Sequence, residues 1–313
     1  MYVAHTTSRS DPGLLPVASN LLTAALFATL VGAGAGLAPA SRRPLRRALA
    51  GPVVRGAALV VLGLLLGRAG SSIIVILVHL GLLTWLVAVL ARCPTWLVTA
   101  VGGALLVLSP VLRESLATQD ARLSLTGPHW LSLLLDLSFT GDTYRLSSLL
   151  AWGAFGLVLA RVLVCARGWF RPVGCGAVLL TAAVLVAWLT GRPVPYSGTH
   201  VELVVDALLA TGVLLSGVGL TRLVRGRGLG WLADLGRMTL TLYTLQILGL
   251  AVLEQRLRPG QPPYGWEVLA ALAVGSLAVA VGWNRVSVTQ RWGRGPLEGS
   301  VERVIDLVGG RRG

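Results

Sequence analysis

Lysine is absent from this sequence, and charged residues of any kind are scarce. Asp, Glu, Lys and Arg make up only 13% of the 313 residues, whereas hydrophobic residues make up 54%, and the mean hydropathy is +0.75. A soluble domain carries about one-quarter charged residues, so this composition excludes a soluble protein. All 27 basic residues are arginine, which fits the coding bias of a GC-rich genome and indicates no mechanism.

Cysteines and the strong catalytic motifs are also few. Cys93, Cys165 and Cys175 lack metal-ligand spacing, and we expect them to be reduced packing residues. The chain has no zinc-type histidine pair, no serine nucleophile elbow and no phosphate-binding Walker loop. We therefore expect no metal site and no tightly bound cofactor.

Long apolar runs dominate what remains, and each is about the length needed to cross a bilayer. Because backbone hydrogen bonds must be closed within lipid, these runs predict helices. We expect an all-α, polytopic transmembrane helix bundle with about nine spans, at residues 14–38, 52–67, 72–91, 95–112, 147–166, 173–190, 203–221, 238–257 and 267–284.

The net charge of +14 would suggest a nucleic-acid partner in a soluble protein, but in a membrane protein the distribution of arginine among loops sets orientation. If loops alternate sides, the larger share of the arginines falls on the side that carries the C-terminal tail. The positive-inside rule then places this tail in the cytoplasm of a multi-pass cell-membrane protein. We expect the bilayer, and no nucleic acid, as a partner.

This topology divides the chain into an extracytoplasmic segment (1–13), the transmembrane domain (14–284) and a cytoplasmic tail (285–313). The longest outer loop, 113–146, contains an apolar stretch at 129–139 that is too short to cross and is expected at the interface. In the tail, Leu297, Val301, Val304, Ile305 and Val308 recur at helical spacing. They predict a short amphipathic helix on the inner leaflet, with Glu298 and other charged residues facing away.

Three ionisable residues in or near the spans are candidates for chemistry. His79 lies in the middle of the third expected span, where an ionisable group is costly and is a functional candidate, although a neutral imidazole bonded to a neighbouring helix explains it equally well. Glu202 and Asp206 lie one turn apart at the outer end of the seventh span. They would bind a polar acceptor from outside, or they are simply solvated or matched by arginine.

Other candidates lie toward the C-terminal half. Thr239, Tyr243 and Gln246 share one helical face, which would line the bundle interior for substrate or for interhelical hydrogen bonds. Four arginines flank a glycine-rich cytoplasmic loop that would hold phosphates or would serve only as topogenic charge: Arg222, Arg225, Arg227 and Arg237. Gly32, Gly34 and Gly36 favour close helix packing.

Two C-terminal motifs carry a family resemblance. The run LGRMTLTLYTLQIL at 235–248, followed by GPLE at 295–298, resembles the C-terminal signature of the bacterial YeiB-like family, known as domain of unknown function 418. The runs at 27–37, 55–67, 76–83 and 140–161 resemble actinobacterial members similar to heparan-alpha-glucosaminide N-acetyltransferase.

The resemblance implies a transmembrane acyltransferase that takes an acetyl group from cytoplasmic acetyl-CoA. Its acceptor would be an amine or a hydroxyl, typically on a glycan or another envelope component. Relatives begin with an additional helix bearing an acidic residue and an Arg-Gly pair, so we expect that an upstream tenth span is missing here. In the animal enzyme the catalytic histidine follows that first helix, and His5 is the histidine in the corresponding region.

The sequence therefore favours an acetyl-CoA-dependent membrane acyltransferase. His5 or His79 would act as general base, the four arginines would attract the phosphates of acyl-CoA, and Tyr243, Gln246, Glu202 and Asp206 would orient donor or acceptor. The rival hypothesis is a non-catalytic multi-pass protein, either a small-solute transporter or an envelope scaffold. The acceptor, the acyl chain and a homodimer are left open.

Overall fold

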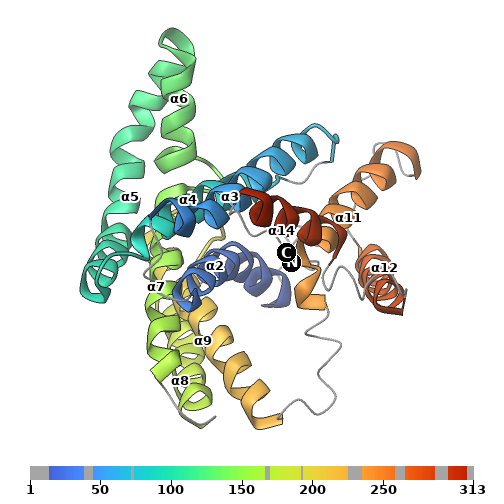
Figure 1. Ribbon diagram of the computed structural model, residues 1–313. Coiled ribbons are helices and arrows are strands. Elements are labelled where there is room, and N and C mark those ends of the chain that lie inside the picture. Colours follow the sequence, from blue (N-terminus) through green and yellow to red (C-terminus); the bar gives the residue numbers. More distant parts are fainter. Residues whose placement is uncertain are drawn as a thin grey trace. The chain divides into compact units, whose positions relative to one another are not determined.

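The computed structural model describes residues 14–38, 45–71, 74–165, 170–191, 193–224, 235–257, 265–285 and 295–308. Every regular element within these ranges is a helix (Figure 1). The chain divides into two compact units, one formed by 1–19, 43–78 and 224–313, and the other by 20–42 and 79–223. The first is called the 43–78/224–313 unit and the second the 20–42/79–223 unit.

Six helices are long and apolar enough to cross a bilayer, which confirms the helical membrane class. They are α2 (Leu14–Leu37), α3 (Leu45–Gly67), α5 (Thr95–Thr126), α7 (Leu146–Cys165), α8 (Phe170–Leu189) and α9 (His200–Val224). The other three expected ranges contain α4 (Leu77–Leu90), α11 (Thr239–Val252) and α12 (Trp266–Arg285), of which α4 and the 270–283 part of α12 are shorter apolar segments. The count of nine spans stays a prediction.

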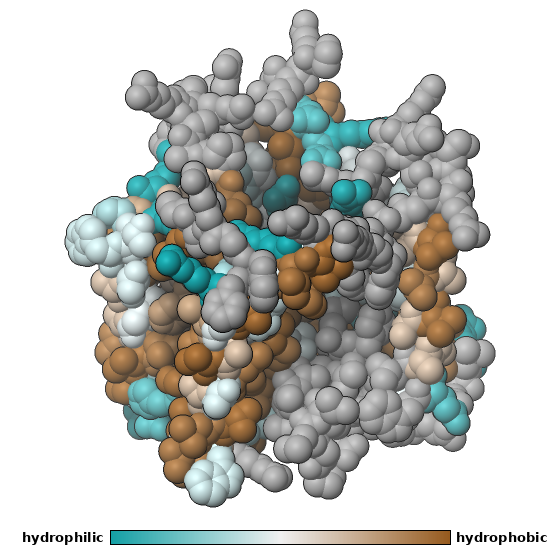
Figure 2. Space-filling model, turned by 90° about the horizontal axis from the view of Figure 1, so that it is seen from below, coloured by the Kyte–Doolittle hydropathy of each residue, from teal (hydrophilic) through white to brown (hydrophobic). Residues whose placement is uncertain are grey.

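Apolar side chains face outward along these helices. Val178, Val184 and Trp188 of α8 are 66% exposed or more, and Figure 2 shows hydrophobic side chains over much of the described surface on one face. A water-soluble protein of this size does not expose apolar surface on this scale. Lipid is the solvent that such a surface requires.

Small residues bring α2 and α7 into close contact within the 20–42/79–223 unit. A Cβ atom added at Gly32 would overlap the backbone carbonyl of Gly153, and one added at Gly156 would overlap that of Thr29. Gly36 meets α7 one turn further along, whereas the space beside Gly34 is open. The expected glycine packing is therefore confirmed for Gly32 and Gly36 but not for Gly34, which lies on another face.

The segment 113–146, predicted to be an outer loop, is mostly helical. Helix α5 continues to Thr126, and α6 (His129–Leu135) with the π-helix η1 (Asp136–Thr140) returns alongside it (Figure 1). Asp120 of α5 stabilises this helical hairpin of α5, α6 and η1, because its carboxylate accepts hydrogen bonds from Ser132 at 2.8 Å and Thr140 at 2.7 Å. Residues after Leu112 are polar but favour helix, and hydropathy alone does not detect such an extension.

In the 43–78/224–313 unit, the expected C-terminal helix is present as α14 (Pro296–Val308) and packs against α3 and α11. Glu298 does not face away as expected. One carboxylate oxygen accepts the Thr241 amide proton at 3.0 Å and the other accepts the Thr241 hydroxyl proton at 2.6 Å. A carboxylate here satisfies one free amide in the first turn of α11 and complements the positive end of its dipole.

Replacing Glu298 with alanine should loosen α14 from α11. The loss of a charge-assisted contact at a helix N-terminus predicts a destabilisation of about 1–2 kcal/mol. Thermal unfolding in detergent measures it, with Asp306→Ala on the exposed side of the same helix as the matched control. Equal melting temperatures for the two variants would contradict the capping role.

Candidate functional site

The candidate site is built around the start of α9 in the 20–42/79–223 unit. The preceding segment, 193–199, turns sharply, and Tyr196 and Gly198 both have left-handed backbone conformations with φ of 64° and 71°. Such a φ is uncommon for a residue other than glycine. A Cβ atom at position 198 would also lie within 2.9 Å of side-chain atoms of Arg113 and Arg145, so these arginines would have to shift.

Glu202 holds this turn in place from the first turn of α9. Its carboxylate accepts hydrogen bonds from the backbone amides of Tyr196 and Gly198 and from the Ser197 hydroxyl at 3.3 Å. The Glu202 residue is only 3% exposed. A buried carboxylate that accepts several amide protons is a fixed structural anion, so Glu202 is not solvated.

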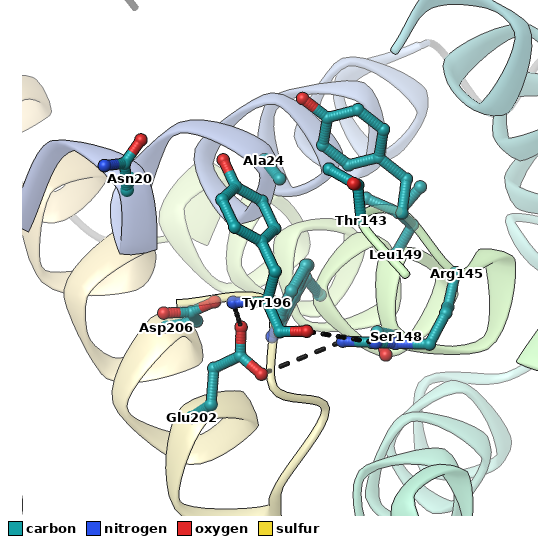
Figure 3. A pocket seen from close by; sticks show the side chains of 11 residues that line it. Asn20, Ala24, Thr143, Arg145, Ser148, Leu149, Tyr196, Glu202 and Asp206 are labelled. Atoms are coloured by element: carbon teal, nitrogen blue, oxygen red, sulfur yellow. Dashed lines mark hydrogen bonds and ion pairs between the residues drawn. The ribbon is translucent and has the colours of Figure 1, made fainter. Parts of the chain in front are cut away.

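Arg145 is the cation that faces Glu202. It lies immediately before α7, is 4% exposed, and its Nη2 approaches Glu202 Oε2 at 3.7 Å (Figure 3). Nη1 donates to the carbonyls of Gly141 at 3.1 Å and Tyr196 at 3.4 Å. Burial lowers the pKa of the Arg145 guanidinium and Glu202 opposes this effect, but arginine stays protonated in proteins. The result is a buried ion pair that ties 141–145 to the 193–199 turn.

Asp206 follows one turn after Glu202 and is 3% exposed. Its Oδ1 has no hydrogen-bond partner in the described part of the chain. Asp206 lines a small pocket with room for about one water-sized group. The pocket is lined by Asn20, Ala24, Thr143, Tyr144, Arg145, Ser148, Leu149, Trp152, Tyr196, Glu202 and Asp206, drawn in Figure 3. We call it the Asp206 pocket.

His79 contacts Tyr144, one of the residues that line the Asp206 pocket. The His79 ring meets Tyr144 edge-on at a centroid distance of 5.8 Å, and Tyr144 meets Tyr196 at 6.0 Å. The His79 Nδ1 atom is buried and has no hydrogen-bond partner among the described residues. The structure therefore places His79 beside a wall of the Asp206 pocket.

His79 lies near the start of its helix and not in the middle of a span-length helix, as the sequence predicted. Helix α4 begins at Leu77, so His79 lies in its first turn, because residues 74–76 are not helical. A run of β-branched apolar residues precedes it, and hydropathy does not distinguish such an extended run from a helix. The first turn of α4 belongs to the end predicted to be extracytoplasmic, as do Glu202 and Asp206.

Two of the four arginines predicted to bind phosphate, Arg222 and Arg237, lie within the described residues. Arg222 lies in the last turn of α9 and donates to the Leu163 carbonyl at 3.4 Å. Arg237 is exposed in the other unit, in a groove of about 400 Å³ that Arg55, Glu298 and Glu302 also line. Arg225, Arg227 and His5 lie outside the described residues. Gathering of the four arginines around phosphate stays a prediction.

The expected polar stripe of α11 is buried only in part. Tyr243 is 5% exposed and Gln246 is 1% exposed, and neither amide atom of Gln246 has a partner within the described ranges. Thr239 is exposed, and its hydroxyl donates to the Gly236 carbonyl at 2.7 Å. Tyr243 and Gln246 belong to the 43–78/224–313 unit, whereas the residues that line the Asp206 pocket belong to the 20–42/79–223 unit.

Sequence reasoning did not identify Asn20, Tyr144, Arg145 and Tyr196 as site residues. The one usable signal was Arg145, an arginine placed directly before an apolar span on the side that carries few arginines. Within the described ranges, no group of three or more His, Cys, Asp or Glu side chains has the geometry to hold a metal ion. Comparison with known proteins finds no matching family model, no similar curated protein and no similar solved structure.

Proposed function

We propose that this chain is an integral membrane acyltransferase that transfers an acetyl or acyl group from cytoplasmic acyl-CoA to an amine or hydroxyl acceptor of the envelope, such as a sugar. One structural observation carries the proposal. Glu202 and Asp206 line one pocket and His79 contacts its wall at Tyr144, so the three ionisable residues that the sequence marks in or near apolar spans belong to one polar region, at the predicted outer end of the 20–42/79–223 unit. The resemblance to YeiB-like proteins in the GPLE and LGRMTLTLYTLQIL motifs supports the reaction class.

His79 would act as the general base. The acceptor nitrogen or oxygen attacks the thioester carbonyl, its proton passes to His79, the carbon–sulfur bond breaks and CoA leaves as the thiolate, which then takes up a proton. Imidazole suits this step because its ordinary pKa lies near the working pH. Asp206 would orient the acceptor, and the cytoplasmic arginines Arg222, Arg225, Arg227 and Arg237 would attract the phosphates of the donor.

The experiment that tests this function has two parts. Acetyl-CoA should raise the melting temperature of the full chain in detergent in a saturable manner, because any ligand that prefers the folded state stabilises it. His79→Ala should reduce acetyl transfer by about 10²–10⁴-fold while leaving acetyl-CoA binding intact. His129→Ala is the matched control, because His129 lies exposed on α6.

Unchanged transfer by His79→Ala would remove His79 from the mechanism. An absence of any acetyl-CoA shift in the folded protein would favour the second candidate, a small-solute transporter. Asp206 specifically supports that candidate, because a buried carboxylate with an unpartnered oxygen inside a transmembrane helix is typical of an ion or substrate path.

A further inference from the structure

We infer that the Asp206 pocket binds a monovalent cation, either an inorganic ion such as Na⁺ or the ammonium group of a small solute. The inference begins with the charges that line the pocket. Arg145 carries one positive charge, and Glu202 and Asp206 carry one negative charge each when ionised. Because Arg145 is paired with Glu202, the pocket carries one net negative charge whenever Asp206 is ionised.

An uncompensated carboxylate is costly at this depth. Asp206 is 3% exposed, lies on a helix that is apolar enough to cross a bilayer, and has an oxygen with no partner in the described structure. Buried charges are stable when they are paired or when they coordinate an ion. Glu202 is already engaged by two backbone amides, Ser197 and Arg145, so Asp206 is the acidic group left to receive a ligand.

The size and lining of the pocket select the type of cation. The pocket has room for about one water-sized group, which suits a bare monovalent ion or a terminal ammonium and excludes a whole sugar. Asn20, Tyr144 and Tyr196 also line the pocket, and amide oxygens and aromatic rings are groups that attract a cation. A divalent ion would exceed the single negative charge, and Ca²⁺ requires about 6–8 oxygen ligands.

A cation at Asp206 is compatible with either proposed function. In an acyltransferase it would be the ammonium group of an amine acceptor or a structural ion, and in a transporter it would be the coupling ion or the solute. Binding can be measured without acetyl-CoA. If acetyl-CoA does not bind, the cation site is therefore not contradicted. If no cation binds, the proposed acyl transfer is not contradicted.

The test is a thermal shift on the full chain in detergent, with N-methyl-D-glucamine chloride replaced stepwise by NaCl, by ammonium chloride or by methylammonium chloride at constant total chloride. One of these cations should raise the melting temperature saturably, by about 2 °C at tenfold excess over its Kd. A shift with Na⁺ alone identifies an inorganic ion site, and a shift with ammonium or methylammonium alone identifies an amine site.

Asp206→Asn should abolish the cation-dependent shift. Asp142→Asn is the matched control and should retain the shift, because Asp142 is exposed and lies outside the pocket. Asn20→Ala provides a second variant that keeps the charge at position 206, and it should weaken the affinity several-fold. If no cation shifts the wild-type protein relative to N-methyl-D-glucamine, or if Asp206→Asn keeps the full shift, the inference is overturned.

Discussion

Replacing Glu202 with alanine is expected to destabilise the protein by about 3–5 kcal/mol, because removing one partner of a buried ion pair leaves the other charge unpaired. Arg145, which is 4% exposed, would lose its anion, and the amides of Tyr196 and Gly198 would lose their acceptor. Unfolding in mixed detergent measures the change. Glu114→Ala is the matched control, because Glu114 is exposed on α5 and its loss should change stability by less than about 0.5 kcal/mol.

A double variant separates charge from packing. Replacing Arg145 with methionine and Glu202 with leucine removes both charges together, and buried ion pairs replaced by apolar residues of similar size are often neutral in stability. We expect this double variant to recover part of the loss, but not the part that comes from the amides of the 193–199 turn. If Glu202→Ala is no less stable than Glu114→Ala, the anchoring role of Glu202 is wrong.

Replacing Gly32 with alanine is expected to separate α2 from α7. The new Cβ would overlap the Gly153 carbonyl, and backbone atoms on both sides leave no flexible side chain to move aside. The overpacking penalty should reach or exceed about 3 kcal/mol, the upper end of the range for insertions into tight cores. Melting temperature and the fraction of monodisperse protein in detergent measure the effect.

Gly34→Ala provides the control for this prediction within the same helix. No atom lies within 4 Å of a Cβ built there. Alanine also favours helix over glycine, so the change should be neutral or stabilising by up to about 1 kcal/mol. Gly156→Ala should reproduce the Gly32 result from the α7 side, because its Cβ would overlap the Thr29 carbonyl. Equal stability of the Gly32 and Gly34 variants would contradict the close packing of α2 on α7.

Hydropathy was sufficient to predict the helices but not their ends. The apolar runs placed all six membrane-length helices, because length and composition are local properties of the chain. The same signal ended α5 near residue 112, although the helix continues to Thr126, because polar residues that leave the bilayer can remain helical. It also started the third helix too early, so that His79 was expected in the middle of the helix and not in its first turn.

The candidate site was predicted in its parts but not in its assembly. Glu202 and Asp206 were identified because charges in an apolar run are conspicuous. The pairing of Glu202 with Arg145, 57 residues earlier in the chain, depends on tertiary packing and leaves no local pattern. Glu298 shows the same limitation, because helical periodicity assigned it to the polar face of α14 while its actual partner is Thr241 of α11.

The most direct test of a site that receives its acceptor from outside is to determine on which side of the membrane the Asp206 pocket lies. In a cysteine-free background, Thr199→Cys introduces a thiol at an exposed position beside the pocket, and Arg303→Cys introduces one at an exposed position on α14. A membrane-impermeant maleimide applied to intact cells should label position 199 and should label position 303 only after the membrane is opened. Labelling of position 303 but not of position 199 in intact cells would contradict both the orientation and the extracytoplasmic acceptor site.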